Sequence, residues 1–141
     1  YNAFYMSNPK NVNDAANVAP DKVVTDEIVR YMSVADQYAG RVGLNYALAP
    51  KAGIGATLGA RIEGVPAYDL IGDSDGFRRP GYIFSIEPGI SYSTAKNTLF
   101  VSLPIATQRN RIKSANDWVN NKHGDAAFAD YFISATVTHR F

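Results

Sequence analysis

The final eleven residues alternate between apolar and polar side chains, and this pattern favours an extended backbone there. The polar positions run from Ser134 to Arg140. The apolar positions are Tyr131, Ile133, Ala135, Val137 and Phe141. Because successive side chains of a β-strand point to opposite faces, a period of two predicts a strand with one apolar and one polar face. A transmembrane β-barrel uses such strands, with the apolar face toward lipid and aromatic residues at the interface.

This segment resembles the C-terminal signal strand of outer-membrane β-barrel proteins of Gram-negative bacteria. Those strands commonly end on phenylalanine, after alternating hydrophobic residues and an aromatic residue near the strand's start. His139 departs from the pattern, because a more apolar residue is usual there. The residues that match it are Tyr131, Ile133, Ala135, Val137 and Phe141. The resemblance implies a protein of the cell outer membrane with a periplasmic C-terminus. Its partners would be outer-membrane lipid, lipopolysaccharide and the barrel-assembly machinery.

The same alternation recurs upstream in segments of about the length that a tilted strand needs to cross a bilayer. The expected strands cover residues 1–6, 37–49, 53–65, 81–93, 98–109 and 128–141. The predicted fold class is therefore all-β, a transmembrane antiparallel up-and-down β-barrel with five to six strands visible. Because bacterial single-chain barrels start at about eight strands, we expect this chain to be the C-terminal part of a larger barrel. Pro88 and Pro104 predict local bulges, because proline cannot donate to the ladder.

The connections between the expected strands alternate in length. Residues 49–52 and 93–97 form tight turns, whereas residues 7–36, 65–80 and 110–127 form long polar stretches. Outer-membrane barrels have short periplasmic turns and long extracellular loops. If the last strand ends in the periplasm, every long stretch falls on the outside, which supports the barrel interpretation independently of the strand pattern.

Composition permits this fold and argues against several classes of function. The net charge of +1 gives no electrostatic basis for binding nucleic acid. Cysteine is absent, which excludes disulfide and zinc–thiolate frameworks. There is no run of about 18 apolar residues and hence no membrane-spanning helix in the sequence. No nucleophile elbow, phosphate loop or zinc motif occurs, so we expect no enzyme and no cofactor.

A soluble sandwich or lipocalin-like binding protein also alternates, with the apolar face turned inward. Periodicity alone does not distinguish inside from outside. The polar face is rich in Gly, Ser and Thr and poor in Lys, whereas a solvent-exposed sheet face usually carries more Lys and Glu. This composition favours the membrane barrel.

Four charged residues fall on the predicted lumen face of the barrel: Arg41, Arg61, Glu63 and Glu87. Cross-strand Arg–Glu pairs would form a constriction that selects ions. The alternative is a structural role, in which the paired charges hold a packed interior together.

Three cations, Arg109, Arg111 and Lys113, lie at the outer end of a predicted strand. They are candidates for binding an anion or a lipopolysaccharide phosphate. The alternative is a solvated loop base that pairs with Asp117 or Asp125. The neighbouring pair 78–79, Arg-Arg, presents the same choice.

Two weaker patterns concern metals. His123 and Asp125 are two candidate ligands on one loop, and two ligands make a weak metal site. Asp73, Asp75 and Gly76 resemble the start of a calcium loop, but the remaining ligands are missing and turn chemistry explains them. We therefore assign no metal.

The primary functional hypothesis is a channel or transporter for small solutes. The alternative is a structural barrel, an anchor or subunit of a larger cell-envelope complex. The alternative rests on the long loop 7–36, in which residues 23–30 look amphipathic and would dock a partner or fold over the pore.

Deletion of Phe141 tests the signal-strand interpretation. One interfacial Phe contributes about 1–2 kcal/mol of burial, too little to unfold a large barrel. The deletion is expected to deplete the protein from the outer membrane in cells while leaving refolding into detergent nearly intact. Membrane fractionation and refolding yield measure the two effects, and normal outer-membrane levels of the truncated protein would contradict the interpretation.

Overall fold

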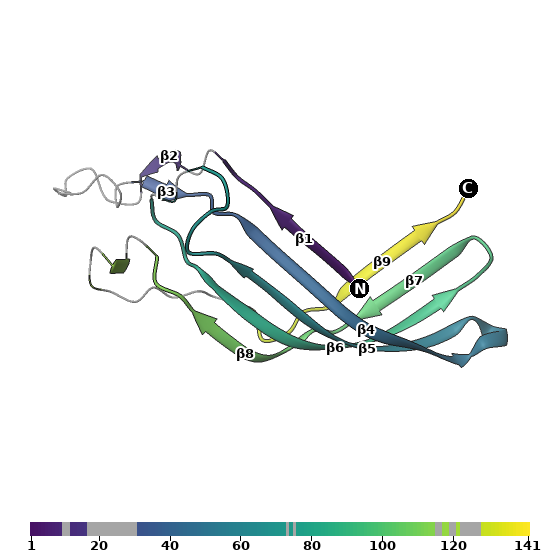
Figure 1. The fold of residues 1–141 in the computed structure, drawn as a ribbon. Coiled ribbons are helices and arrows are strands. Elements are labelled where there is room, and N and C mark those ends of the chain that lie inside the picture. The colour runs from purple at the N-terminus through teal and green to yellow at the C-terminus, as the bar shows by residue number, and fades with distance from the viewer. Residues whose placement is uncertain are drawn as a thin grey trace.

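The computed structural model describes residues 1–9, 12–16, 31–72, 74, 76–114, 117–118, 121 and 128–141. This part of the chain forms an antiparallel all-β sheet curled into a half-barrel, which confirms the predicted fold class at that level (Figure 1). The strands are β1 (Asn2–Met6), β2 (Val12–Ala16), β3 (Tyr31–Ser33), β4 (Gln37–Ala49), β5 (Ile54–Val65), β6 (Gly81–Ser93), β7 (Asn97–Ser102), β8 (Ile105–Arg111) and β9 (Ser134–His139). None of the helices in the described ranges is long and apolar enough to cross a membrane.

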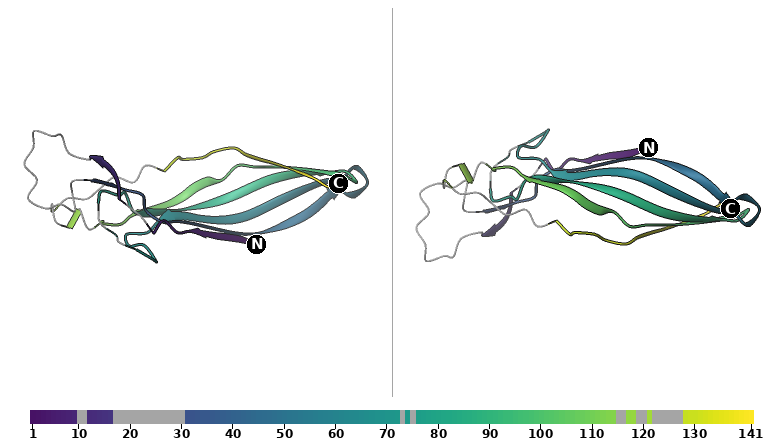
Figure 2. Two further views of the ribbon diagram at one scale, coloured as in Figure 1. Left: turned by 90° about the horizontal axis from the view of Figure 1, so that it is seen from above. Right: turned by 90° about the horizontal axis from the view of Figure 1, so that it is seen from below.

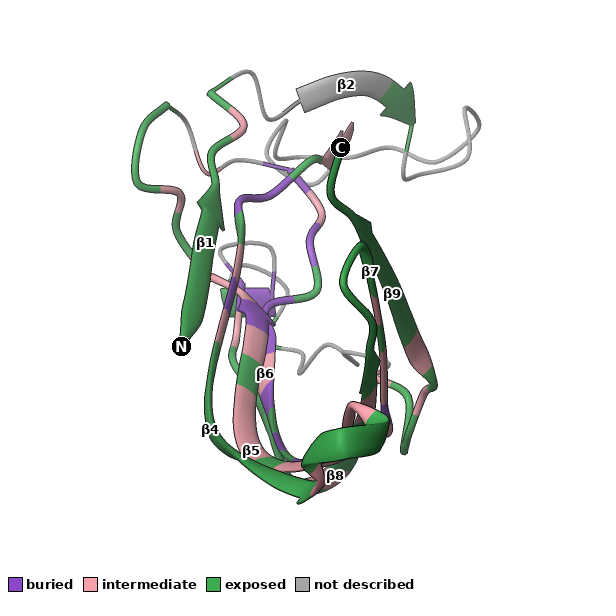
Figure 3. Ribbon diagram, turned by 90° about the vertical axis from the view of Figure 1, so that its right-hand side faces the viewer, coloured by how far each residue is buried: buried purple, intermediate pink, exposed green. Residues whose placement is uncertain are grey.

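The main sheet has seven strands, which follow one another across the sheet in chain order. The path is β1-β4-β5-β6-β7-β9, and β8 pairs with the half of β6 that β7 leaves free. Strands β2 and β3 form a separate two-stranded sheet. Viewed along the strands, the main sheet is a trough with β1 at one rim and β9 at the other (Figure 3).

The β4–β5 and β6–β7 turns lie at one end of the trough, and the described part of the β5–β6 connection lies at the other (Figure 2). Strands β4 and β5 are joined by a 3-10 turn, η2 (Pro50–Ala52), and residues 94–96 join β6 to β7. Gly53 ends the η2 turn with φ of 71°, a left-handed conformation that glycine adopts without strain. A Cβ at Gly53 would lie 2.0 Å from the carbonyl oxygen of Ser93, so the turn also depends on the missing side chain.

The predicted strand over 98–109 is two strands in the structure, so the prediction of one continuous strand is wrong. The break falls at Leu103 and Pro104, opposite Pro88 of β6. The carbonyl of Pro88 accepts a hydrogen bond of 2.9 Å from the Leu103 amide. The N–H and C=O groups of one strand residue point to the same side, so the N–H that Pro88 lacks is missing on this same side of β6. The two prolines remove two ladder donors at one place, which ends β7 there and starts β8 beyond it.

Two other predicted boundaries also differ. Strand β9 is shorter than the predicted strand over 128–141, because its partner β7 ends at Ser102 and the ladder therefore starts only at Ser134. Before that point Tyr131 forms a single isolated bridge. The predicted loop over 7–36 contains the hairpin strands β2 and β3.

The polar face of the sheet is its concave face. The Arg41 guanidinium of β4 lies over the ring of Phe100 of β7, although β5 and β6 separate these strands. The Arg61 guanidinium of β5 lies over the ring of Phe132, which precedes β9. Side chains from such distant strands converge only on the inner side of a curved sheet, so the apolar face is convex. Its exposed large side chains include Val42, Leu44, Tyr46, Leu48, Leu58, Ile86, Ile90, Tyr92 and Val137.

Two glycines, one on β4 and one on β5, pack against each other on the concave face. Gly43 and Gly59 are in register, and a Cβ added to Gly43 would lie 2.9 Å from the Gly59 Cα and 2.9 Å from the Leu58 carbonyl oxygen. A backbone atom cannot move aside as a flexible side chain can. The close approach of the two strands therefore requires glycine at this position.

The substitution Gly43→Ala is expected to lower the free energy of unfolding by about 1–3 kcal/mol through overpacking against backbone. Gly40→Ala on the same strand is the matched control, because its Cβ would meet nothing closer than 3.8 Å. Urea unfolding in detergent micelles measures both variants. Equal stability of the two variants would contradict the close packing at Gly43.

Candidate functional site

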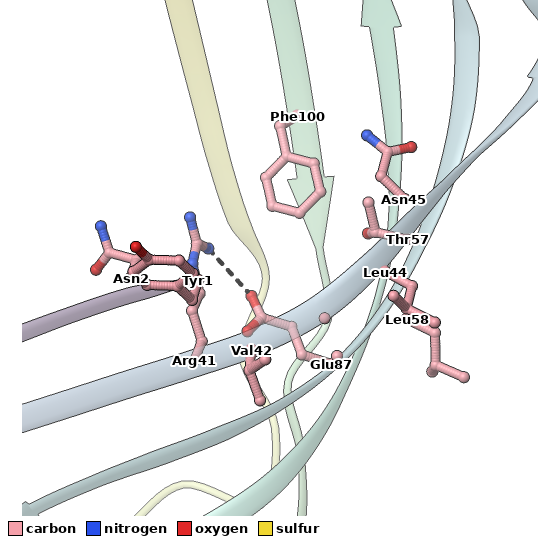
Figure 4. A pocket seen from close by; sticks show the side chains of 12 residues that line it. Tyr1, Asn2, Arg41, Val42, Leu44, Asn45, Thr57, Leu58, Glu87 and Phe100 are labelled. Carbon is pink, nitrogen blue, oxygen red and sulfur yellow. Dashed lines mark ion pairs between the residues drawn. The ribbon is translucent and has the colours of Figure 1, made fainter.

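Arg41 of β4 and Glu87 of β6 form an ion pair on the concave face, across the intervening strand β5 (Figure 4). Arg41 Nη1 lies 3.5 Å from Glu87 Oε1. Gly59, the β5 residue in register with Glu87, has no side chain and leaves the path between the two charges open. Glu87 is buried, and its Oε1 also accepts a hydrogen bond of 2.7 Å from the Ser102 hydroxyl of β7. The buried carboxylate is thus paired and hydrogen-bonded, as burial of a charge requires.

A second ion pair lies beside the first on the concave face. Arg61 Nε donates a hydrogen bond of 3.0 Å to Glu63 Oε2, two residues along the same strand. Arg61 is directly opposite Arg41 in the β4–β5 register, where like charges repel. The two guanidinium groups instead lie over separate rings, Arg41 at 5.7 Å from Phe100 and Arg61 at 5.2 Å from Phe132. The structure therefore brings all four predicted lumen residues onto one face, as two ion pairs.

A cavity of about 300 Å³ opens onto the concave face at the first ion pair (Figure 4). Gly43 and Gly59 lie between its charged and its uncharged polar lining, so no side chain divides the space. The side chains that line it include Arg41, Asn45, Thr57, Glu87 and Phe100. Thr57 Oγ1 is buried and has no hydrogen-bond partner among the described residues.

The electrostatic character of this cavity is set by unequal exposure. The Arg41 side chain is 43% exposed, whereas the Glu87 side chain is 5% exposed. The accessible charge is therefore the guanidinium, although the pair as a whole is neutral. The cavity offers a cation, an aromatic ring and uncharged polar groups to a molecule in the trough.

Two of the three predicted outer-loop cations contact different groups in the described structure. Arg109 forms an ion pair with Asp130, and Lys113 Nζ lies 4.6 Å from the Trp118 ring centroid. Arg111 lies two residues after Arg109 on β8, at the next position of the same face. The predicted partner Asp117 instead accepts hydrogen bonds of 2.9 Å from the backbone and hydroxyl groups of Ser114. Pairing of Arg109 does occur, but with a different acid from the two expected.

The sequence interpretation missed a buried cluster at the end of the trough that carries the long connections. Arg78 donates two parallel hydrogen bonds to Asp69, of 2.7 and 2.9 Å, and a third of 2.7 Å to the Ser33 hydroxyl. Both charged side chains are almost fully buried. Asp69 in turn accepts a hydrogen bond of 2.9 Å from the Asp36 amide. Arg78 therefore ties the β5–β6 connection to β3, and Asp69 ties it to Asp36, the residue before β4. Arg79 lies over the Phe77 ring.

Asp36 is the second acid of this cluster and is fully buried. Its carboxylate accepts hydrogen bonds from the Asn8 amide (2.6 Å), the Leu70 amide (2.9 Å) and the Tyr5 hydroxyl (2.7 Å). Burial by itself raises the pKa of Asp36, but these hydrogen bonds and the charge of Arg78 outweigh it, and the pKa lies below its ordinary value. The alternation of apolar and polar residues along a strand gives no signal for such a cluster, because the members of the cluster are far apart in the chain.

Two of the predicted assembly residues, Ala135 and Val137, lie on the convex, apolar face in the β7–β9 ladder. Val137 is opposite Leu99 in the β7–β9 ladder, and Ala135 is opposite Val101. His139, which departs from the pattern, hydrogen-bonds through Nδ1 to the Asn97 side chain at 2.7 Å. The exposed apolar residues among the predicted set are Tyr131, Ile133, Val137 and Phe141.

Several sequence candidates lie outside the described residues: His123, Asp125, Asp73, Asp75 and the segment 23–30. Gly76 is described and has φ of 88°, in keeping with turn chemistry. Among the described residues, no three His, Cys, Asp or Glu side chains are grouped to hold a metal ion.

No protein-family model, curated protein or solved structure matches the chain. The site is therefore interpreted from its own geometry.

The Asp36 carboxyl is expected to titrate below about pH 4, the usual midpoint for aspartate. Because its folded-state pKa is lowered, the stability that it contributes is present above the ordinary pKa and is lost as the pH falls through the folded-state pKa. The NMR shifts of the Asn8 and Leu70 amides, which donate to it, report the transition. The Asp36→Asn variant should lack this titration, and a wild-type midpoint above about 4 would be inconsistent with the cluster described.

Proposed function

We propose that the chain is part of an outer-membrane β-barrel that acts as a channel or transporter for small solutes. The observation that carries the proposal is the sidedness of the sheet. Its convex face carries exposed large apolar side chains, and its concave face carries the Arg41–Glu87 and Arg61–Glu63 pairs. This is the arrangement of a barrel that meets lipid on the outside and water on the inside.

The convex face would be unfavourable in water. Leu44 is 84% exposed and Tyr46 is 72% exposed, and their neighbours on the same face are also apolar. Removal of apolar surface from water contributes about 25 cal/mol per Å², so a continuous face of this kind favours a lipid environment or another apolar surface. A lipocalin-like barrel would place these side chains inside, so the direction of curvature supports the membrane barrel over that alternative.

The concave face has the properties of a hydrated path. Its small residues, among them Gly43, Gly59 and Ser85, leave space next to the ion pairs. A purely structural lumen would fill this space with side chains. Open volume beside accessible charge supports solute passage, with the paired residues acting on selectivity.

The proposed orientation follows from the connections. The end of the trough with the long connections and the Asp36–Asp69–Arg78 cluster would face the outside of the cell, and the end with η2 would face the periplasm. Lipid and lipopolysaccharide would then contact the convex face, and the barrel-assembly machinery would insert the protein.

One observation favours the second candidate, a structural subunit or anchor. Strands β1 and β9 each have a partner on only one side in the described sheet, and open strand edges pair readily with further strands. Such strands would come from the same barrel or from another envelope subunit. Conductance distinguishes the candidates, because an anchor requires no open path.

The proposed function is tested by reconstitution of the intact protein in planar bilayers. We expect discrete single-channel currents, and we expect Arg41→Gln to reduce the anion-to-cation permeability ratio. One charge acting at about 4 Å in water is worth about 1 kcal/mol, which corresponds to a several-fold change in the ratio.

Lys51→Gln is the matched control, because it removes the same charge from the exposed η2 turn, away from the concave face. This variant should keep the wild-type permeability ratio. Absence of current from correctly folded protein would reject the channel proposal and favour the anchor.

A further inference from the structure

We infer that the cavity at Arg41 is a binding site for small organic carboxylates that carry a second hydrogen-bonding group. This inference deepens the proposed function and rests on it, since it names the class of solute that the trough would pass. It depends on which hydrogen-bonding groups of the cavity are already used and which are available.

The guanidinium of Arg41 has donors that its present contacts do not use. Its distance of 3.5 Å to Glu87 exceeds the roughly 2.7–2.9 Å of a charge-assisted hydrogen bond. Glu87 Oε1 already accepts the shorter bond from the Ser102 hydroxyl. The Arg41 guanidinium also lies over the face of Phe100, and this contact engages no N–H donor in the guanidinium plane. A planar guanidinium held in this way can donate two parallel hydrogen bonds to one carboxylate.

The neighbouring Arg61 differs from Arg41 in this respect. Its Nε donates to Glu63 at 3.0 Å, and its Nη2 contacts the same carboxylate oxygen. Two of the nitrogens of Arg61 are thus occupied by an acid of its own strand. The inference therefore assigns recognition of the solute carboxylate to Arg41 rather than to the pair of arginines.

The second requirement on the solute comes from Asn45. Its side chain is exposed and lines the same cavity, and it is directly opposite Thr57 in the β4–β5 register. Its amide offers both a donor and an acceptor to a solute. The Thr57 hydroxyl oxygen lies against Gly89 beneath this position and is closed to a solute.

The size and shape of the cavity limit the solute. A volume of about 300 Å³ is at the small end of the range for ligand pockets. Gly43 and Gly59 leave the space between the Arg41 end and the Asn45 end clear, and Phe100 provides an apolar wall. A short molecule with a carboxylate at one end, an apolar middle and a hydroxyl at the other end fits these features.

Binding is measured by NMR titration of the intact protein, refolded in detergent micelles, with three probes of matched length. The probes are γ-hydroxybutyrate, butyrate and butanol. We expect γ-hydroxybutyrate to bind more tightly than butyrate and butanol to show no saturable binding. Shifts should be centred on the resonances of Arg41 and Asn45. Equal binding of all three probes would overturn the inference.

Four variants separate the contributions. Arg41→Gln should weaken carboxylate binding by at least about tenfold. Arg41→Lys should give an intermediate loss, because it keeps the charge but lacks the planar fork. Asn45→Leu, which is nearly isosteric, should reduce γ-hydroxybutyrate to the affinity of butyrate and leave butyrate unchanged. Lys51→Gln should match the wild type.

The outcomes also separate this inference from the proposed function. Channel current without Arg41-dependent carboxylate binding overturns the inference and leaves the channel proposal standing. Arg41-dependent binding without current supports the site and rejects the channel. Because Arg41→Lys and Asn45→Leu are conservative, failure of Arg41→Gln to fold would not prevent the test.

Discussion

Because β4, β5 and β6 are paired along nearly their whole length, their side chains are sorted strictly onto two faces, and the curl of the sheet decides which set faces inward. The inner side of a curved sheet offers less room for each residue than the outer side. Glycine, serine and alanine are frequent on the concave face, and Gly43 packs directly against Gly59 there. Large side chains such as Leu44 and Tyr46 occupy the convex face, where neighbouring side chains point away from one another. The placement of the charges follows from this sorting.

The same small residues make the charged network possible. Arg41 reaches Glu87 across β5 at Gly59, where no side chain intervenes, and Ser102 completes the network from a third strand. A Cβ at position 59 would lie 2.9 Å from the Val42 carbonyl oxygen of β4, so the packing of β4 against β5 also depends on glycine there. Curvature, ion pairing and open volume therefore have one common cause. The concave face thus combines a charged network with open space beside it.

The end of the trough with the long connections is stabilised differently from its walls. There the backbone leaves the sheet, and hydrogen bonds to buried charged side chains replace the hydrogen bonds between strands. Arg78 and Asp69 form a two-bond pair, and Asp36 gathers donors from Asn8 and Leu70. These contacts fix the connection between β5 and β6 against the start of β4.

Alternation of apolar and polar residues was sufficient to place the main strands, since the expected ranges 37–49 and 81–93 coincide with β4 and β6. It also placed Arg41 and Glu87 each on the polar face of its own strand, because residues two apart on a strand share a face whatever the tertiary structure. It did not indicate that Pro88 and Pro104 meet across the ladder and divide one strand into two, since their meeting depends on register.

The sequence by itself therefore determined the strands, their two faces and the charged residues of the polar face. Only the tertiary structure decided that the polar face is concave, that Arg41 lies over Phe100, and that Asp36 and Asp69 are buried beside Arg78. The physical reason is the distance along the chain over which each property is set. Which face a side chain occupies is set by its nearest neighbours in the chain. Which side chains converge depends on twist, register and curvature added up over several strands, and no local pattern contains that sum.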